Sequence, residues 1–556
     1  MANTIRNVLL EVKSSDAILA SATLVDRTEV PVLTAQAISG LPDVEFDTGF
    51  GCVEIPRMDE PDIAEFSPSN AFDLERGRSI NEDHKTNTYL MRATVDDSQL
   101  SDLGKQVKSA RNVVAIYADP EIQVCDPLLQ KSSGESPEMF PQICPGSPPL
   151  GTDRHVAARL GVPMLHQRSM DGRGVYVAVV DTGINLRHLR MRGKRPILDA
   201  GRSWMARAGD TPGNLPVSHG TMVAYDTMIA APRATLLDIA LLRSTRSGGS
   251  VMAGLLSDAI RAYVHLYRII RGPHRPGAFS SMVVNNSWGM FHESWDFPPG
   301  HPGRYADNPA HPFNRIVGVL DHAGADILFA AGNCGRECPD GRCQGITNAG
   351  IYGANSHPQV LSVAGVDVLK RRVGYSTSGP GKLSFMKPDL CGYTHFRGSG
   401  VYPADGGTSA ATPVVAGLVA AFRSRFAYNP VDFRTSPAAI RNLLTRTAED
   451  RGSIGFDFDY GWGIANGQRL ALIRSLSVMK PQEEAASSIE ELTDMEQELN
   501  SIEGLDQVPQ DPEEILATAS QQELSTTQEE DITASIIGEY QPPLSVQETE
   551  QAELVS

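Results

Sequence analysis

Short, almost uninterrupted apolar runs alternate with longer amphipathic stretches through the middle of the chain. The apolar runs include VYVAVV at 175–180, TLLDIALL at 235–242 and DILFAA at 326–331, and they predict buried strands. Between the runs, VMAGLLSDAIRAYVHLY at 251–267 and PVVAGLVAAFRSRF at 413–426 predict helices. Apolar strands separated by helices indicate an α/β fold with a doubly wound, mostly parallel sheet that helices cover on both faces.

The first 125 residues have a different pattern. RNVLLEV at 6–12 predicts a strand, and TYLMRATV at 88–95, QLSDLGKQVKSA at 99–110 and VVAIYADPEIQV at 113–124 predict strand, helix and strand. This order is typical of a small α+β domain. Prolines with Gly and Ser follow at 126–151 and predict a linker, so the larger domain is expected at 152–476.

Charge separates a third region from these two. The 556 residues carry a formal net charge of −18, yet the segment from 481 to the end holds 20 Asp and Glu and no Lys or Arg. The rest of the chain is therefore close to neutral, which argues against nucleic acid as a partner. The acidic segment has few aromatic residues and cannot bury much apolar surface, so residues 477–556 are predicted to be a disordered tail.

The N-terminus and the cysteines bear on the compartment. Glu11, Lys13 and Asp16 interrupt the first apolar stretch, so no Sec signal is recognised, and no run of 18 apolar residues predicts a membrane span. Seven cysteines, an odd number, do not describe a disulfide framework in a chain of this length. The expected localisation is cytoplasmic, or exported by a route without a recognisable Sec signal.

The tripeptide Asp-Thr-Gly occurs twice, at Asp47 and at Asp181. Two copies could form the paired carboxylates of an aspartic protease, but EFDTGFG follows no long apolar strand. The second copy stands at the carboxyl end of VYVAVV, where parallel sheets present catalytic side chains. We therefore interpret Asp47 as an ordinary turn residue and Asp181 as a candidate catalytic residue.

Two further candidates begin predicted helices. His219 opens HGTMVA, and Ser409 stands in GGTSAATP. A serine at a helix start lies beside unpaired backbone N–H groups and the positive end of the helix dipole, both of which favour a developing oxyanion. Asn333 follows the strand DILFAA and supplies another donor.

The segments VAVVDTGI, HGTMVA, NNSWG, FAAGN and GTSAATP, in this order over about residues 150–475, resemble the subtilisin-like serine proteases. The resemblance implies a serine endopeptidase that cleaves protein or peptide substrates through an acyl-enzyme, without metal or cofactor. It implies these roles: Asp181, His219 and Ser409 as catalytic triad; Asn333, with the Ser409 amide, as oxyanion donor; and Ser247, Gly248, Gly249, Ser287, Trp288, Gly289, Ala331 and Gly332 as substrate-binding residues. The alternative is a catalytically silent member of this fold that acts as a binding module.

The N-terminal domain resembles the inhibitory propeptides of the same proteases, mainly at 88–95, 99–110 and 113–122. It is expected to fill the cleft as an intramolecular inhibitor. The alternative is an ordinary accessory domain.

Two segments near the cleft leave alternatives open. MFHESWDFPPGHPGRYADNPAHP at 290–312 holds His292, His301 and His311 and is either a Pro-rich loop that shapes the cleft or a metal site. CGRECPDGRC at 334–343 has cysteines spaced for zinc, for a local disulfide or for free thiols. The tight calcium loop of secreted subtilisins is expected to be absent.

Overall fold

The structure is a computed structural model. It describes residues 5–13, 41, 44–47, 49–56, 88–100, 103, 106–107, 110, 113–125, 143–243, 252–272 and 279–476, which belong to one compact unit. The acidic tail, the linker residues 126–142 and Ser247, Gly248 and Gly249 lie outside these ranges, so the predictions for them stay untested. None of the helices in the described ranges is long and apolar enough to cross a membrane.

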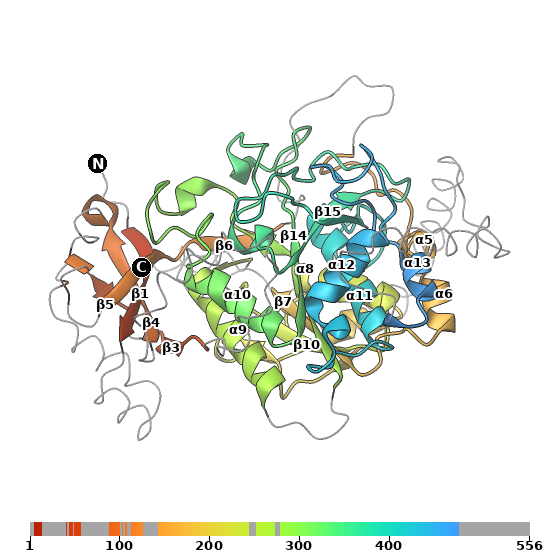
Figure 1. Cartoon of the computed structure of the whole chain (residues 1–556), viewed down its shortest axis with the longest axis horizontal. Coiled ribbons are helices and arrows are strands. Elements are labelled where there is room, and N and C mark those ends of the chain that lie inside the picture. The colour runs from red at the N-terminus through yellow and green to blue at the C-terminus, as the bar shows by residue number, and fades with distance from the viewer. Residues whose placement is uncertain are drawn as a thin grey trace, which may run out of the picture. The chain divides into compact units, whose positions relative to one another are not determined.

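An eight-stranded sheet with only parallel pairings organises the larger domain (Figure 1). Its order is β16-β15-β14-β12-β7-β10-β8, and β9 also pairs with β10. The predicted parallel α/β sheet is confirmed. The strands are β7 Val175–Asp181, β8 Ile197–Leu198, β9 Trp204–Met205, β10 Thr235–Ala240, β12 Ser281–Asn286, β14 Ala325–Ala330, β15 Leu361–Val366 and β16 Leu390–Tyr393.

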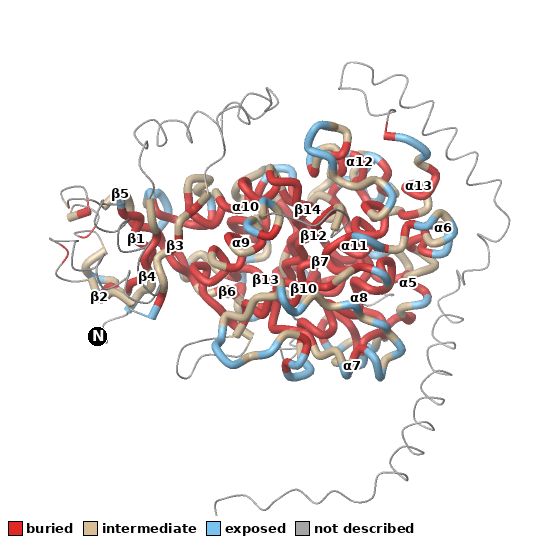
Figure 2. The backbone as a smooth tube through the Cα atoms, turned by 90° about the horizontal axis from the view of Figure 1, so that it is seen from below, coloured by how far each residue is buried: buried red, intermediate tan, exposed pale blue. Residues whose placement is uncertain are grey.

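Helices cover both faces of this sheet, and the strands between them are buried (Figure 2). Alternate residues of β7, such as Tyr176 and Val180, share a core cluster with α9 (Leu256–Arg271) and α10 (Pro312–His322). The opposite face carries α8 and α11. Shorter helices are α5 Asp153–Arg159, α6 Val162–Gln167, α7 Leu186–Met191, α12 Pro437–Arg446 and α13 Gly467–Leu472.

The helices α8 (His219–Ala230) and α11 (Gly407–Arg423) touch along their length. At Gly417 a Cβ would lie 2.3 Å from the carbonyl oxygen of Thr227, so only glycine fits between them. Both helices begin at the edge of the sheet where the parallel strands end. The two helix starts are therefore held at a fixed separation.

The N-terminal region forms an antiparallel sheet in the order β2-β4-β1-β5, with β3 also paired to β4. The predicted strands at 6–12 and 88–95 are confirmed as β1 Ile5–Lys13 and β4 Thr88–Asp96. Of the described positions in the predicted helix at 99–110, residue 99 ends a 3-10 helix, residues 100, 103 and 106–107 are α-helical, and residue 110 is not helical. The other strands are β2 Glu45–Phe46, β3 Val53–Glu54 and β5 Val113–Ala118.

The single strand predicted at 113–124 is wrong. It divides into β5 and β6 (Glu121–Val124), which belong to different sheets. Pro120 has no N–H to continue a ladder, and the carboxylate of Asp119 instead accepts the backbone N–H and the hydroxyl of Ser257, both at 2.7 Å. Asp119 thereby caps α9, and the chain turns into the larger domain.

Polar contacts join the N-terminal sheet to α10. Glu11 accepts hydrogen bonds from the Arg315 guanidinium at 3.0–3.2 Å and from the Tyr117 hydroxyl at 3.0 Å. His311 Nε2 lies 2.9 Å from the carbonyl oxygen of Ala118. Because Glu11 and His311 are almost completely buried, these contacts are shielded from water.

Candidate active site

Asp181 and His219 form a buried pair. Asp181 is the last residue of β7, and both its carboxylate oxygens lie within 3.0 Å of His219 Nδ1. Neither side chain is exposed to solvent. This contact places the ring hydrogen on Nδ1 and makes Nε2 the basic nitrogen of His219.

Local features fix the start of α8 against this aspartate. A Cβ on Gly220 would lie 2.6 Å from the carbonyl oxygen of Gly183, so the helix approaches the Asp-Thr-Gly loop with no room for a side chain. The Thr182 hydroxyl accepts the N–H of Gly220 at 2.8 Å and contacts the Ser218 hydroxyl at 2.8 Å. The loop and the helix therefore hold the histidine in one position.

Ser409 lies in the first turn of α11 and is completely buried. Its hydroxyl donates to the carbonyl oxygen of Cys125 and lies 3.2 Å from that of Ser287. The Ser287 hydroxyl in turn donates to the Ser409 carbonyl at 3.0 Å. The serine thus contacts a carbonyl group of the N-terminal region directly.

Asn333 contacts the same carbonyl. Its side-chain oxygen accepts the N–H and the hydroxyl of Thr408, both at 3.0 Å, which orients Nδ2 in the opposite direction. Nδ2 donates to the Cys125 carbonyl oxygen at 2.7 Å. An amide donor and a serine hydroxyl therefore converge on one peptide carbonyl, that of the Cys125–Asp126 bond.

The strand β6 brings that carbonyl into place. It pairs antiparallel with β11 (Ala253–Leu255) on one side and β13 (Trp288–Gly289) on the other. The N–H of Cys125 donates to the Ser287 carbonyl at 3.0 Å. Residues 121–125 lie as a peptide between two edge strands, which is how clefts bind extended segments.

The side chain of Cys125 is enclosed by apolar groups. It is 1% exposed and forms a cluster with Phe291, Ala330, Cys334 and Cys343, with Trp295 packed against them. Cys334 and Cys343 form a disulfide. The Cys125 side chain is therefore packed against aromatic groups and a disulfide.

The substrate-binding residues implied by sequence have different outcomes. Ser287, Trp288 and Gly289 do contact β6. Ala331 and Gly332 stand beside Asn333, where Gly332 donates to the Thr408 hydroxyl at 3.1 Å and Ala331 to the Val363 carbonyl at 2.9 Å. On the opposite edge the pairing strand is β11, which directly follows the undescribed residues 244–251.

The sequence did not indicate a role for several residues of the site. Thr408 and Ala330 lie within the recognised motifs, but no role was predicted for them, and Phe291 lies in the histidine-rich insertion. Arg342, inside CGRECPDGRC, also reaches β6. Only the cysteines around Arg342 marked that segment as unusual.

The cysteine alternatives are resolved in favour of disulfides. Cys334 pairs with Cys343, as in the local reading, and Cys338 pairs with Cys144, which the sequence did not suggest. A bonded cysteine offers no thiolate for zinc. The remaining thiols are Cys52, Cys125 and Cys391.

The three histidines of the insertion have separate contacts. His292 caps a short 3-10 helix through Ser294, His301 accepts the N–H of Gly303, and His311 meets the N-terminal sheet. Across the described ranges, no cluster of three or more His, Cys, Asp or Glu side chains could hold a metal ion. The insertion shapes the surface that the N-terminal sheet contacts.

Asp47 lies in a turn, as predicted. Its side chain accepts the N–H of Gly49 at 2.9 Å, and its carbonyl accepts the N–H of Phe50 at 3.1 Å. Its second carboxylate oxygen lies 2.8 Å from the Arg92 guanidinium. The aspartate is thus a structural residue of the N-terminal sheet.

Two buried carboxyl groups of the larger domain, Asp238 and Asp226, have raised pKa values. Burial, assisted by the nearby Asp181, raises the pKa of Asp238 to about 7, although its carboxylate accepts the N–H groups of Ile184 and Gly213. Burial and the adjacent Asp405 raise the pKa of Asp226 well above its usual value.

Comparison with known proteins agrees with this geometry. Residues 172–463 match the model of the subtilase family, peptidase S8. Subtilisin BL from Lederbergia lenta is 27% identical over 320 residues, which cover 56% of this chain and 96% of that protein. Subtilisin E from Bacillus subtilis (strain 168) is 27% identical over 325 residues, covering 56% of this chain and 70% of that protein.

A parallel α/β sheet with a buried Asp–His pair at a strand end and a serine in the first turn of a helix that packs on α8, together with these likenesses, defines a subtilisin-like serine endopeptidase. The matched segment covers more than half of the chain and includes Asp181, His219, Asn333 and Ser409. The chain belongs to the subtilase family.

Proposed function

We propose that the chain hydrolyses peptide bonds through Asp181, His219 and Ser409 by way of an acyl-enzyme. One observation carries the proposal: the Cys125 carbonyl oxygen accepts hydrogen bonds from both Asn333 Nδ2 and the Ser409 hydroxyl. The nucleophile and an oxyanion donor therefore both lie at one peptide carbonyl. For attack, the Ser409 hydroxyl must turn its hydrogen from this oxygen to His219 Nε2, so that Oγ can add to the carbonyl carbon.

The proposed proton transfers use the contact between Asp181 and His219. His219 Nε2 takes the Ser409 proton as the Oγ–carbon bond forms, and Asp181 stabilises the resulting imidazolium through Nδ1. Asn333, together with the Ser409 amide, binds the tetrahedral oxygen. His219 then returns the proton to the leaving amine, the carbon–nitrogen bond breaks, and water releases the acyl group by the reverse steps.

The same proposal gives the N-terminal domain the role of an intramolecular inhibitor. Its segment 121–125 is paired on both sides and leaves no edge strand open to another peptide. Asp119 and Glu11 anchor the domain to α9 and α10. The bond between Cys125 and Asp126 is then the first substrate of Ser409.

The cysteine pairing supports one of the two expected localisations. Disulfides persist in oxidising compartments and are rare in reducing ones. Cys144–Cys338 and Cys334–Cys343 both lie in the catalytic part of the chain. We infer export to an oxidising environment, where protein or peptide substrates are cleaved.

Labelling with a fluorophosphonate, followed by mass spectrometry of the intact chain and of its peptides, tests the proposed function. The adduct should appear on Ser409, because His219 is the proposed base for its hydroxyl. His219→Ala should lose labelling while retaining its thermal unfolding midpoint. Labelling that persists in Ser409→Ala would contradict the assignment of the nucleophile. A folded wild-type chain that is never labelled after removal of the N-terminal domain would favour the silent binding module.

A further inference from the structure

A disulfide-closed loop begins directly after Asn333. We call residues Cys334–Cys343 the cystine loop, because the disulfide between these two residues closes its base. A second disulfide ties Cys338, near its middle, to Cys144. The backbone N–H of Asp340 also donates to the Asn333 carbonyl at 2.9 Å. The loop is therefore fixed covalently at two points and joined to the oxyanion residue.

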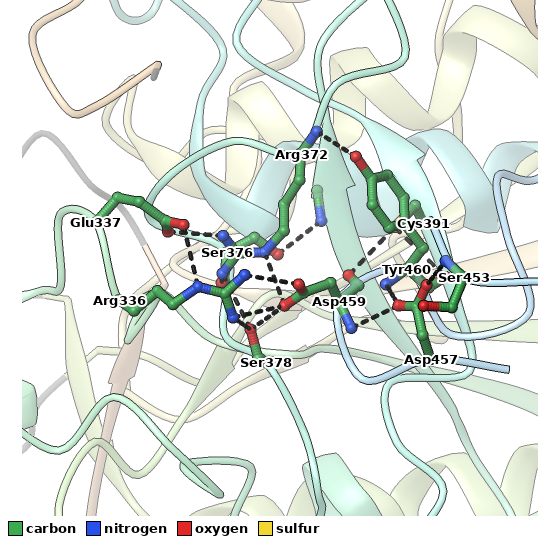
Figure 3. A network of polar contacts seen from close by, with 11 residues as sticks. Arg336, Glu337, Arg372, Ser376, Ser378, Cys391, Ser453, Asp457, Asp459 and Tyr460 are labelled. Carbon is green, nitrogen blue, oxygen red and sulfur yellow. Dashed lines mark hydrogen bonds and ion pairs between the residues drawn. The ribbon is translucent and has the colours of Figure 1, made fainter. Parts of the chain in front are cut away.

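Ion pairs hold the outer side of the cystine loop (Figure 3). Arg336 makes a bidentate contact with Asp459, at 2.7 and 3.0 Å. Glu337 accepts from Arg372 at 2.6 Å, and Arg372, which is almost buried, also donates to Ser378 at 3.1 Å. Paired charges with fixed geometry restrict the motion of the loop.

On its inner side the loop directs Arg342 toward the cleft. The Asp340 carboxylate, itself buried, accepts from Arg342 Nε at 2.9 Å and from Nη2 at 2.6 Å. The guanidinium lies 3.7 Å from the centre of the Phe291 ring. The bidentate pair and the aromatic face leave this side chain one orientation, with Nη1 pointing at β6.

The remaining nitrogen of Arg342 binds the peptide in the cleft. Nη1 donates to the backbone carbonyl of Val124 at 3.0 Å and to the side-chain oxygen of Gln123 at 2.9 Å. The Gln123 amide nitrogen donates to the Glu121 carboxylate, which sets which end of the amide faces Arg342. With Cys125 at P1, the residue before the cleaved bond, Val124 is P2 and Gln123 is P3.

We propose that Arg342 is a specificity-determining residue that selects a hydrogen-bond acceptor, glutamine or glutamate, at P3 of peptide substrates. The inference rests on the proposed function. The bond to the P2 carbonyl forms with any sequence, whereas the bond to the P3 side chain forms only with an acceptor. A positively charged, preoriented donor that meets an apolar or cationic P3 residue loses this partner or is repelled.

Peptides that vary only at P3 test the proposal on the processed enzyme. In Ala-Ile-Xaa-Val-Ala-Asp-Ser, Xaa is Glu, Gln, Ala or Lys, and cleavage falls between the Ala and the Asp. Wild-type kcat/KM should fall in that order, with Gln about 10- to 100-fold above Ala. Arg342→Met should bring the Gln to Ala ratio close to one while the Ala peptide is still cut.

A matched variant controls for charge and for loop integrity. Arg336→Met removes one positive charge from the same loop on the side away from the cleft, and the P3 preference should persist. An unchanged Gln to Ala ratio in an active Arg342→Met enzyme overturns the proposal. Loss of the ratio in both variants also overturns it, because the loop and not Arg342 would then set the preference.

A second measurement does not depend on catalysis. In the uncut Ser409→Ala chain, hydrogen exchange of residues 121–125 is compared among Gln123→Ala, Arg342→Met, the double variant and the parent. Arg342→Met should accelerate exchange more in the chain that keeps Gln123 than in Gln123→Ala, because only the former loses the hydrogen bond between Arg342 and the Gln123 side chain. Additive effects of the two substitutions would contradict the contact, whereas absence of peptidase activity in the wild type would count against the proposed function alone.

Discussion

The carbonyl oxygen of Cys125 lies 2.7 Å from Nδ2 of Asn333. Cys125 belongs to the segment that connects the N-terminal region to the catalytic domain. The same asparagine is oriented from behind by Thr408, so its donor is aimed before any external substrate arrives. A donor that is oriented in advance stabilises developing charge without reorganisation.

Asn333→Ala should therefore reduce turnover more than binding. We expect kcat to fall about 10²–10³-fold, the loss typical of removing one oxyanion donor from a subtilisin, with KM nearly unchanged. Steady-state kinetics on a peptide substrate measures both constants. An increase confined to KM would assign the transition-state contact to another group.

Cleavage of the chain by itself should occur between Cys125 and Asp126. The serine and the oxyanion donor already contact that carbonyl, so this bond is presented before all others. Mass spectrometry of purified wild type should show a fragment ending at Cys125, and Ser409→Ala should stay full length. An active chain that remains uncut would identify the N-terminal region as an accessory domain.

Small apolar residues should be preferred at P1. The Cys125 side chain fills a pocket walled by Phe291 and by the Cys334–Cys343 disulfide, and these walls cannot retreat easily. Peptides with Cys or Ala at P1 should be cleaved at least about tenfold faster than peptides with Phe or Lys. Equal rates across this set would show that the pocket opens in the free enzyme.

Acid should weaken the binding of the N-terminal domain to the catalytic domain, because His311 becomes protonated. Burial, assisted by the nearby Arg315, lowers the pKa of His311 to about 3, although Nε2 donates to the Ala118 carbonyl. Release of the domain returns this pKa toward about 6.5, so affinity is full above that value and is lost as pH falls toward 3.

Asp119, whose pKa burial raises to about 6, changes affinity in the opposite direction over part of the same range. The informative quantity is therefore the difference between wild type and His311→Gln, which keeps a donor for Ala118. The wild-type inhibition constant, relative to that of the variant, should rise about tenfold per pH unit below 6. Parallel pH profiles would exclude His311 as the titrating group.

Asp238→Asn should change the pH dependence of stability. The folded pKa of about 7 is above the unfolded value, so the favourable contribution of Asp238 is complete below about pH 4 and is lost as pH rises through 7. The asparagine oxygen can still accept from Ile184 and Gly213. Between pH 4 and 8, the free energy of unfolding of Asp238→Asn, measured with denaturant, should rise relative to that of the wild type by at most about 4 kcal/mol. A constant difference would mean that Asp238 does not titrate there.

The central sheet could be predicted because a strand covered on both faces is apolar at nearly every position. β7 and β14 each have one Asp among otherwise apolar or aromatic residues. The strand β16 could not be predicted in this way, because its sequence LCGY is short and contains Gly392, and glycine is typical of turns. A Cβ there would lie 2.3 Å from the Ala411 carbonyl, so this glycine is required by the passage of α11 and not by a turn.

The candidate triad residues follow from motifs that are local in the sequence, but Arg342 does not. Its position depends on two cysteine pairings, and one of them, Cys144–Cys338, spans 194 residues. Seven cysteines allow many pairings, and no local pattern selects among them. β6 was likewise hidden, because its partners β11 and β13 are more than 120 positions away in the chain.

Both disulfides lie on the carboxyl side of the Cys125–Asp126 bond, and neither crosses it. Before that bond is cut, the N-terminal domain faces the cleft at an effective concentration fixed by the chain itself and unaffected by dilution. Afterwards the two pieces are separate molecules, and occupancy of the cleft depends on how much of each is present. The cleaved enzyme would therefore be inhibited by the N-terminal piece at high concentration and become active once both are diluted into a larger volume.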